Sequence, residues 1–242
     1  MGDQKTPVPT SDQEASTTSS SDVAAFVRKA QALGALKSVK KGRLILALDA
    51  TMSRQPTWDL ACGLQAEMFD AAGKVGSLDV QLVYFRGFGE CRSSKFVNDT
   101  GSLKNLMTKI DCRGGHTQIG KVLTHALKET GREAVDALVY IGDAMEEAVD
   151  DLADKAGQLG LRHVPVFVFQ EGRDPVAEQA FREIARLSNG AWFRFDSNSA
   201  ATLAKLLSSI AVYASGGFTA LEARGTNEDR LLIGHMRGRD KR

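Results

Sequence analysis

This chain of 242 residues has few cysteines, no long apolar run and almost no net charge. Its three cysteines are an odd number without C-x-x-C spacing, which argues against a disulfide framework and a zinc cluster. No apolar stretch approaches the ~20 residues that cross a bilayer, and the polar beginning lacks the apolar core of a signal peptide. A formal net charge of +1 gives no overall reason to expect nucleic acid or an anionic membrane. We therefore expect a cytoplasmic protein.

The sequence divides into four segments by composition. Residues 1–21 are rich in Ser, Thr, Asp, Gln and Pro, so we expect a disordered polar tail. Apolar residues at helical spacing predict a helix within residues 22–41 that packs on the domain. Residues 42–215 are consistent with one α/β domain, because apolar strand-like and helix-like stretches alternate. Residues 216–242 are polar and end in basic residues, and they are expected to form a C-terminal extension.

The alternation within residues 42–215 predicts the fold class. Most of the apolar runs suit strands buried on both faces of a parallel sheet. Gly87 and Gly89 mark a tight turn into residues 91–96, which alternate with polar residues and predict an antiparallel edge strand. The expectation is a doubly wound α/β fold, with a mostly parallel central sheet, one antiparallel edge strand and helices on both faces. The predicted strands are residues 44–48, 80–85, 91–96, 137–141, 164–169 and 191–195.

A polar motif follows the first apolar run, residues 44–48. In an open α/β sheet the ligand crevice lies outside the carboxyl ends of the strands, so Asp49 is expected to face a cleft. Asp49, Thr51 and Ser53 alternate along the chain as it leaves the strand. They can direct one carboxylate and two hydroxyls at a common point. Hard cations such as Mg²⁺ prefer oxygen ligands of this kind.

Two later stretches complete a candidate site. Gly114-Gly115-His116-Thr117 supplies a loop hydroxyl, and Gly142-Asp143 supplies a second carboxylate after another apolar run. Taken singly, each aspartate is explained equally well as the cap of the following helix. The ordered combination favours a cation site formed by five oxygen-bearing side chains, Asp49, Thr51, Ser53, Thr117 and Asp143.

This ordered set resembles the metal-ion-dependent adhesion site (MIDAS) of von Willebrand factor A (VWA) domains, in which D-x-S-x-S, a loop Thr and a loop Asp hold a divalent cation. The resemblance spans residues 42–215. It implies a binding module in which a carboxylate of a partner protein fills the open position of Mg²⁺, Mn²⁺ or Ca²⁺. Intracellular members of the family imply a partner among ATPases or assembly factors. Thr51 stands where Ser is usual, and His116 separates the glycine pair from Thr117.

Four residues beside the expected ligands are predicted to face the partner: Met52, His116, Gln118 and Met145. His116 is assigned to the rim because a hard cation favours oxygen over nitrogen. Met145 is equally consistent with a role as core filling. Glu146 and Glu147 are expected to favour a helix N-terminus electrostatically.

Two other functions remain open. The spacing of Asp49 and Gly142-Asp143 is also similar to that of haloacid-dehalogenase-like phosphatases, in which Asp49 would be the nucleophile. In such enzymes a second acid protonates the leaving group, and here Thr51 occupies its position. The leading expectation is therefore a protein that is not an enzyme. The second possibility is a plain interaction module with a degenerate site, which thermal unfolding with and without Mg²⁺ or Mn²⁺ would distinguish.

Overall fold

The structure is a computed structural model, and it describes residues 41–51, 63, 67–74, 76–195 and 200–238. The expected polar tail and N-terminal helix lie outside the described residues. Of the candidate site, Met52 and Ser53 also lie outside them.

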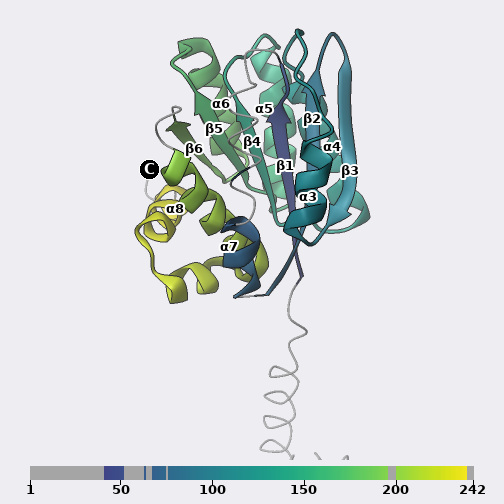
Figure 1. Ribbon diagram of the computed structural model, residues 1–242. Helices are drawn as coiled ribbons and strands as arrows, with labels where there is room; N and C mark the ends of the chain where they lie inside the picture. The colour runs from purple at the N-terminus through teal and green to yellow at the C-terminus, as the bar shows by residue number, and fades with distance from the viewer. Residues whose placement is uncertain (1–40, 52–62, 64–66, 75, 196–199, 239–242) are drawn as a thin grey trace, which may run out of the picture. The chain divides into compact units, whose positions relative to one another are not determined.

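The described residues form a six-stranded sheet in the order β3-β2-β1-β4-β5-β6 (Figure 1). All neighbouring strands are parallel except β2 and β3, which are antiparallel. This arrangement confirms the predicted mostly parallel sheet with one antiparallel edge strand. The strands are β1 (Lys41–Asp49), β2 (Ser77–Arg86), β3 (Glu90–Val97), β4 (Ala137–Gly142), β5 (Val166–Glu171) and β6 (Ala191–Phe195).

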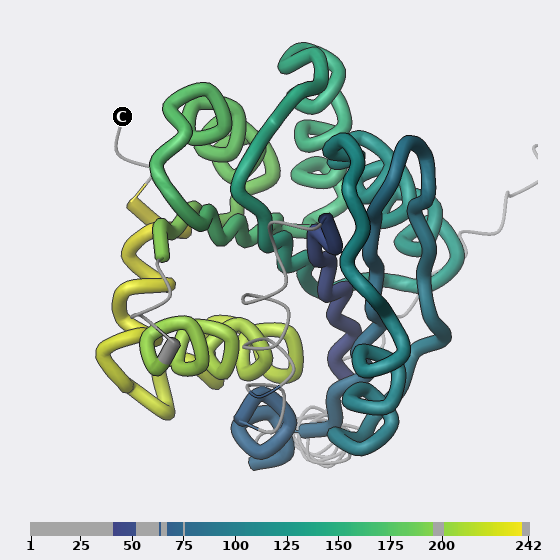
Figure 2. The backbone as a smooth tube through the Cα atoms, turned by 45° about the horizontal axis from the view of Figure 1, so that its top comes forward, coloured from purple at the N-terminus to yellow at the C-terminus, as the bar shows by residue number. Residues whose placement is uncertain are grey.

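Helices cover both faces of the sheet (Figures 1 and 2). Alternate residues of β1 point to opposite faces, as a strand requires. Leu44, Leu46 and Leu48 pack in the core beneath α3, α7 and α8. Ile45 and Ala47 pack in the core beneath α4, α5 and α6. The helices are α3 (Thr100–Met107), α4 (Ile119–Arg132), α5 (Val149–Leu161), α6 (Pro175–Leu187), α7 (Ala200–Arg224) and α8 (Asn227–Arg237).

The position of β1 explains where a ligand could bind. The chain passes from β1 to β2 on one side and later returns to β4 on the other side of β1. The carboxyl ends of β1 and β4 therefore form the point at which the strand order reverses. Asp49 is the last residue of β1, and Asp143 directly follows β4. This is the edge at which doubly wound sheets bind their ligands.

The C-terminal part differs from the expected polar extension. The helix that begins at Ala200 continues to Arg224 with a kink at Gly217, whose φ is 65°. After Gly225 the chain forms α8, which packs against α7 and buries Leu232 completely. Leu232 belongs to the same core cluster as the leucines of β1. A few apolar residues in a polar sequence thus suffice to dock α8.

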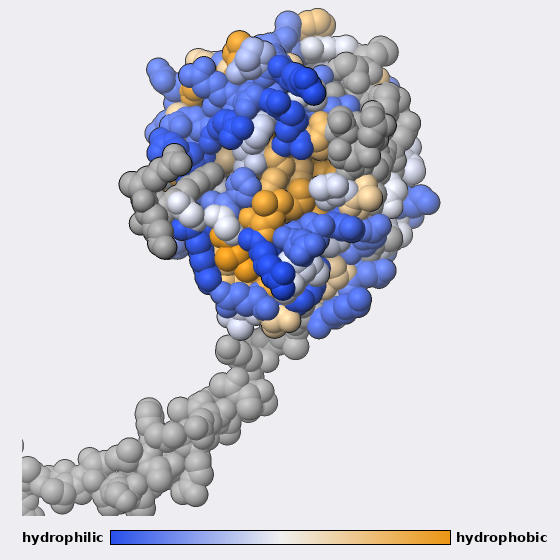
Figure 3. All heavy atoms as spheres, turned by 90° about the vertical axis from the view of Figure 1, so that its left-hand side faces the viewer, coloured by the Kyte–Doolittle hydropathy of each residue, from blue (hydrophilic) through white to orange (hydrophobic). Residues whose placement is uncertain are grey.

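Side chains on the face that carries α8 are mostly hydrophilic, and apolar ones show in its middle (Figure 3). None of the described helices combines the length and the apolar character that crossing a membrane requires.

Candidate functional site

The turn after β1 is fixed by backbone hydrogen bonds on both sides. The N–H of Ala50 donates to the carbonyl of Phe85 at the end of β2, and the carbonyl of Ala50 accepts from the N–H of Arg113, both at 2.9 Å. Asp49 is only 4% exposed, and its Oδ1 accepts the N–H of Thr51 at 2.8 Å. These hydrogen bonds fix the backbone that carries the Asp49 carboxylate and the Thr51 hydroxyl.

The loop that carries Thr117 lies directly on the β2–β3 turn. The N–H of His116 donates to the carbonyl of Gly87 at 3.1 Å. A Cβ atom added to Gly115 would lie 2.1 Å from the Gly87 oxygen, so no larger residue fits there without a shift. Gly114 has no such neighbour within 4 Å. Of the two adjacent glycines, Gly115 is the one that the loop path requires.

Thr117 and Glu146 join this loop to the segment after β4. The N–H of Glu146 donates to Oγ1 of Thr117 at 3.1 Å, and Oε2 of Glu146 accepts the N–H of Thr117 at 3.2 Å. The next residue, Glu147, accepts the N–H groups of Ile119 and Gly120 at the start of α4. These two glutamates therefore stabilise the N-terminus of α4, where negative charge is favourable. The role of favouring a helix N-terminus was predicted from the sequence, and the helix concerned is α4.

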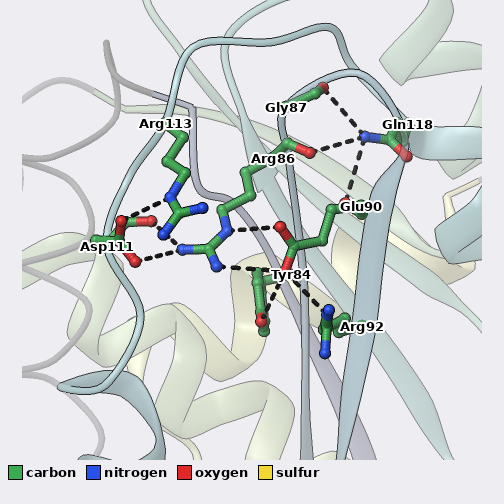
Figure 4. Close-up of polar contacts among 8 residues, drawn as sticks. All are labelled: Tyr84, Arg86, Gly87, Glu90, Arg92, Asp111, Arg113 and Gln118. Atoms are coloured by element: carbon green, nitrogen blue, oxygen red, sulfur yellow. Dashed lines mark hydrogen bonds and ion pairs between the residues drawn. The ribbon is translucent and has the colours of Figure 1, made fainter.

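A cluster of arginine and carboxylate side chains anchors the β2–β3 turn from the other side (Figure 4). Nη1 of Arg86 donates to both the carbonyl and Oδ1 of Asp111 at 2.6 Å, and Nε donates to Glu90 at 3.0 Å. Hydrogen bonds from Arg113 and then Arg86 lower the pKa of Asp111 to about 2. The carboxylate is thus charged at neutral pH and fixes the start of the loop that leads to Gly114.

These segments enclose a depression of about 230 Å³ at the carboxyl end of the sheet. Four of the five predicted ligands line it, and the fifth, Ser53, lies outside the described residues. Glu146 also lines the depression and was not predicted there. The full lining is Asp49, Thr51, Gly114, Gly115, Thr117, Asp143, Ala144 and Glu146.

The donor set is chemically suited to a hard divalent cation. It contains carboxylate and hydroxyl oxygens and no thiol, which is the preference of Mg²⁺, Mn²⁺ and Ca²⁺. Within the described ranges no group of three or more His, Cys, Asp or Glu side chains could hold a metal ion. A cation here would therefore depend on the hydroxyls of Thr51 and Thr117 in addition to Asp49 and Asp143.

The residues predicted to face a partner differ in their exposure. His116 is exposed, its Nδ1 lies 2.9 Å from Oε2 of Glu146, and its ring contacts the edge of Phe88, which is 87% exposed. Gln118 is only 6% exposed, and Met145 lies in the core. Only His116 among the described residues of that group remains on the rim, and Phe88 joins it there.

The buried position of Gln118 has a structural explanation. Its Nε2 donates to the carbonyls of Arg86, Gly87 and Glu90 at 3.2, 3.5 and 3.3 Å (Figure 4). Its Oε1 accepts a hydrogen bond from Nζ of Lys121. Because buried backbone carbonyls need partners, Gln118 serves the β2–β3 turn and is not available to a ligand.

Several solved structures have a similar fold. An aerotolerance-related membrane protein from Bacteroides fragilis, with multiple mutations to serines, has a TM-score of 0.53 at 22% identity, over 68% of this chain and 96% of that one. Proximal thread matrix protein 1 from the mussel byssus, with a zinc-occupied MIDAS motif, has a TM-score of 0.56 at 17% identity, over 81% and 52%. The VWA domain of SpRpn10 has a TM-score of 0.51 at 13% identity, over 66% and 89%.

At these identities the likeness concerns the fold alone, and the chain spans about half the length of the mussel protein. Neither the family models nor the curated protein sequences compared with the chain gave a match. The chain nevertheless has the fold of a VWA domain, as the structural neighbours share it.

Proposed function

We propose that this domain binds a protein partner through a divalent cation, with a carboxylate of the partner completing the ligands of the ion. The observation that carries the proposal is the convergence of Asp49, Thr51, Thr117 and Asp143 on one depression. These side chains come from three segments that are far apart in the sequence. Two carboxylates and neutral hydroxyls leave coordination positions for water and for one outside anion.

Each residue has a defined part in the proposal. Asp49 and Asp143 provide negative charge, and Thr51 and Thr117 provide hydroxyl oxygens. Ser53 is the fifth proposed ligand. The N–H of Glu146 occupies one lone pair of the Thr117 hydroxyl and so restricts the direction of the other. Mg²⁺ is the proposed ion, with Mn²⁺ and Ca²⁺ as alternatives that suit the same oxygens.

The rim supports binding of a protein. Phe88 and His116 form an exposed aromatic pair beside the depression. Exposed aromatic residues are frequent anchors in protein interfaces, and a partner carboxylate would approach the ion past this pair. A zinc-occupied MIDAS is present in the mussel neighbour, which agrees with this type of site. We also propose a cytoplasmic location and a partner among ATPases or assembly factors.

Calorimetric titration with Mg²⁺ tests the cation site. The wild-type protein should bind the ion, and Asp49→Ala should abolish binding while circular dichroism stays unchanged. Asp79→Ala is the matched control, because Asp79 lies at the amino end of β2 and pairs with Lys41. At a concentration about 100 times the Kd, Mg²⁺ should raise the free energy of unfolding by ~2.7 kcal/mol in the wild type and in the control. Unchanged Mg²⁺ binding by Asp49→Ala would remove the proposal.

Affinity purification tests the partner. Wild-type protein and Asp49→Ala should be compared in Mg²⁺ and in chelator, and a genuine partner should be lost under both perturbations. An assay for hydrolysis of an aryl phosphate tests the claim that the protein is not an enzyme. Mg²⁺-dependent hydrolysis that disappears in Asp49→Asn would establish the phosphatase alternative instead.

A further inference from the structure

A second depression, of about 610 Å³, lies beside the candidate cation site on the face covered by α4 and α5. Residues of β3, α4 and the start of α5 line it. The two depressions share a wall, because Glu146 lines the first and Glu147, the next residue, lines the second. A ligand that crosses this wall would contact both.

Cationic side chains outnumber acidic ones around the second depression, which we call the basic groove. Four cations line it, against the two acids Glu147 and Asp151. Burial lowers the pKa of His125, which also lines the groove, so this imidazole is largely neutral at pH 7. The four cations are Arg92, Lys121, Lys128 and Lys155.

Of the four cations, Arg92 alone forms an ion pair among the described residues. Arg92 pairs with Glu90 at 2.9 Å. Lys121 donates to the carbonyl of Gly89 and to Oε1 of Gln118, which are neutral acceptors. Lys155 likewise donates to a backbone carbonyl. Among the described residues, no carboxylate lies within ion-pair distance of the ammonium groups of Lys121, Lys128 and Lys155.

The two acidic side chains of the groove offset only part of the charge of the three lysines. The carboxylate of Glu147 accepts the N–H groups of Ile119 and Gly120 and is directed at the positive end of α4. Asp151 remains as one exposed carboxylate near Lys155. An excess of positive charge over a concave surface attracts anions and raises their local concentration.

We infer that the basic groove binds an acidic segment of the same partner, so that the partner provides further carboxylates beyond the one at the cation. This inference rests on the proposed function. The helix α4 begins two residues after Thr117, a proposed ligand, and its first residue, Ile119, lies nine residues before Lys128, which corresponds to roughly 14 Å of helix at 1.5 Å per residue. An extended peptide covers this distance with about four residues. The partner segment therefore carries its second acidic cluster about four residues from the carboxylate at the cation.

Fluorescence anisotropy with two labelled peptides tests the inference. The first peptide carries one aspartate, a neutral spacer of about three residues and then two aspartates; in the second, the last two aspartates are serines. In Mg²⁺ the wild-type protein should prefer the first peptide by roughly threefold to tenfold, the scale of two exposed charge pairs. The preference should fall as salt is added. Equal affinity of the wild type for the two peptides overturns the inference.

Two charge-reversal variants locate the contact. Lys128→Glu/Lys155→Glu should abolish the preference. Lys104→Glu/Lys109→Glu changes the net charge equally but alters exposed residues in and directly after α3, on the opposite face of the sheet, and it should keep the preference. A preference that survives in the groove variant, or that is lost in the α3 variant, overturns the inference.

Asp49→Ala separates this inference from the proposed function. The variant should bind both peptides more weakly and should retain the ratio between their affinities. If Asp49→Ala and chelator leave both affinities unchanged while the groove variant loses the preference, the groove stands and the cation proposal fails. If Asp49→Ala weakens binding and no variant changes the ratio, the cation proposal stands and the groove inference fails.

Discussion

Two arginine–carboxylate clusters join neighbouring segments of this protein, and they differ in their access to water. Arg224 donates to both oxygens of Asp229 between α7 and α8, and the Asp229 side chain is 0% exposed. Arg86 donates to Asp111 beside the candidate site, and the Asp111 side chain is 62% exposed. The pairing chemistry is the same, and both arginines are largely covered, but the carboxylate of one pair is buried whereas that of the other contacts water.

Because their carboxylates differ in exposure to water, the two clusters are expected to contribute differently to stability. Removing one partner of a buried ion pair leaves an uncompensated charge and costs about 3–5 kcal/mol. Exposed pairs contribute about 1 kcal/mol or less. Asp229 therefore holds the C-terminal helices in the fold, and Asp111 adjusts the position of a loop with little effect on global stability.

The largest effect is expected from Asp229→Ala. Besides its pair with Arg224, Asp229 accepts the N–H of Thr226 and thereby caps α8. The variant should lose about 3–5 kcal/mol of unfolding free energy, measured by urea denaturation. Glu222→Ala is the control, because its pair with Arg237 is half exposed on both sides and should cost less than about 1 kcal/mol. A loss below 1 kcal/mol in Asp229→Ala would show that the buried cluster is not different from an exposed one.

The same cluster predicts a dependence of stability on pH. Burial alone would raise the pKa of Asp229, but hydrogen bonds from Arg224 and Thr226 outweigh it and lower the pKa to about 2. Because the folded pKa lies below the ordinary value of about 3.9, the stabilisation is complete above pH 4 and disappears as the pH falls towards 2. The expected loss is about 2 kcal/mol. Denaturation curves at several pH values should show this loss in the wild type and a smaller one in Asp229→Asn.

Much of the fold follows from local sequence signals. The apolar runs of β1, β4 and β5 and the helical spacing between them predict the parallel sheet. The helix α8 was missed because it contains few apolar residues. Its signal was nevertheless present, since Thr226-Asn227-Glu228-Asp229 has the spacing of a capping box, and both hydrogen bonds of that box are formed.

The candidate site was only partly predictable, because its support comes from contacts between distant residues. The turn after β1 and the strand-end position of Asp143 follow from the sequence. The capping of α4 by Glu147 joins residues 27 and 28 positions apart, and no local pattern indicates it. The burial of Gln118 likewise depends on three carbonyls of the β2–β3 turn. The sequence motifs identify the ligand types, whereas tertiary contacts decide which of the residues beside the ligands remain accessible.

Gly114 and Gly115 lie in the loop that begins at Asp111, and alanine substitution of each tests how the position of this loop affects the site. Gly115→Ala should push the loop away from Gly87 at a cost of about 1–3 kcal/mol, because the new methyl group would overlap the backbone. The displacement should also weaken Mg²⁺ binding, since Thr117 follows two residues later. Gly114→Ala has free space for its methyl group and should change the unfolding free energy by less than about 1 kcal/mol. Equal destabilisation by the two variants would contradict the assigned contact.

The smallest effect on stability is expected from Asp111→Asn. Arg86 keeps its hydrogen bonds to Glu90 in this variant, so the unfolding free energy should change far less than it does in Asp229→Ala. The loop that leads to Thr117 nevertheless loses a charged anchor, and Mg²⁺ affinity should fall roughly threefold, on the scale of one exposed charge pair. Calorimetry and urea denaturation on the same preparation separate the two effects. A loss of unfolding free energy as large as that of Asp229→Ala would mean that exposure to water does not weaken the Arg86–Asp111 pair. The distinction between this pair, which positions a loop, and the Arg224–Asp229 pair, which holds the fold, would then fail.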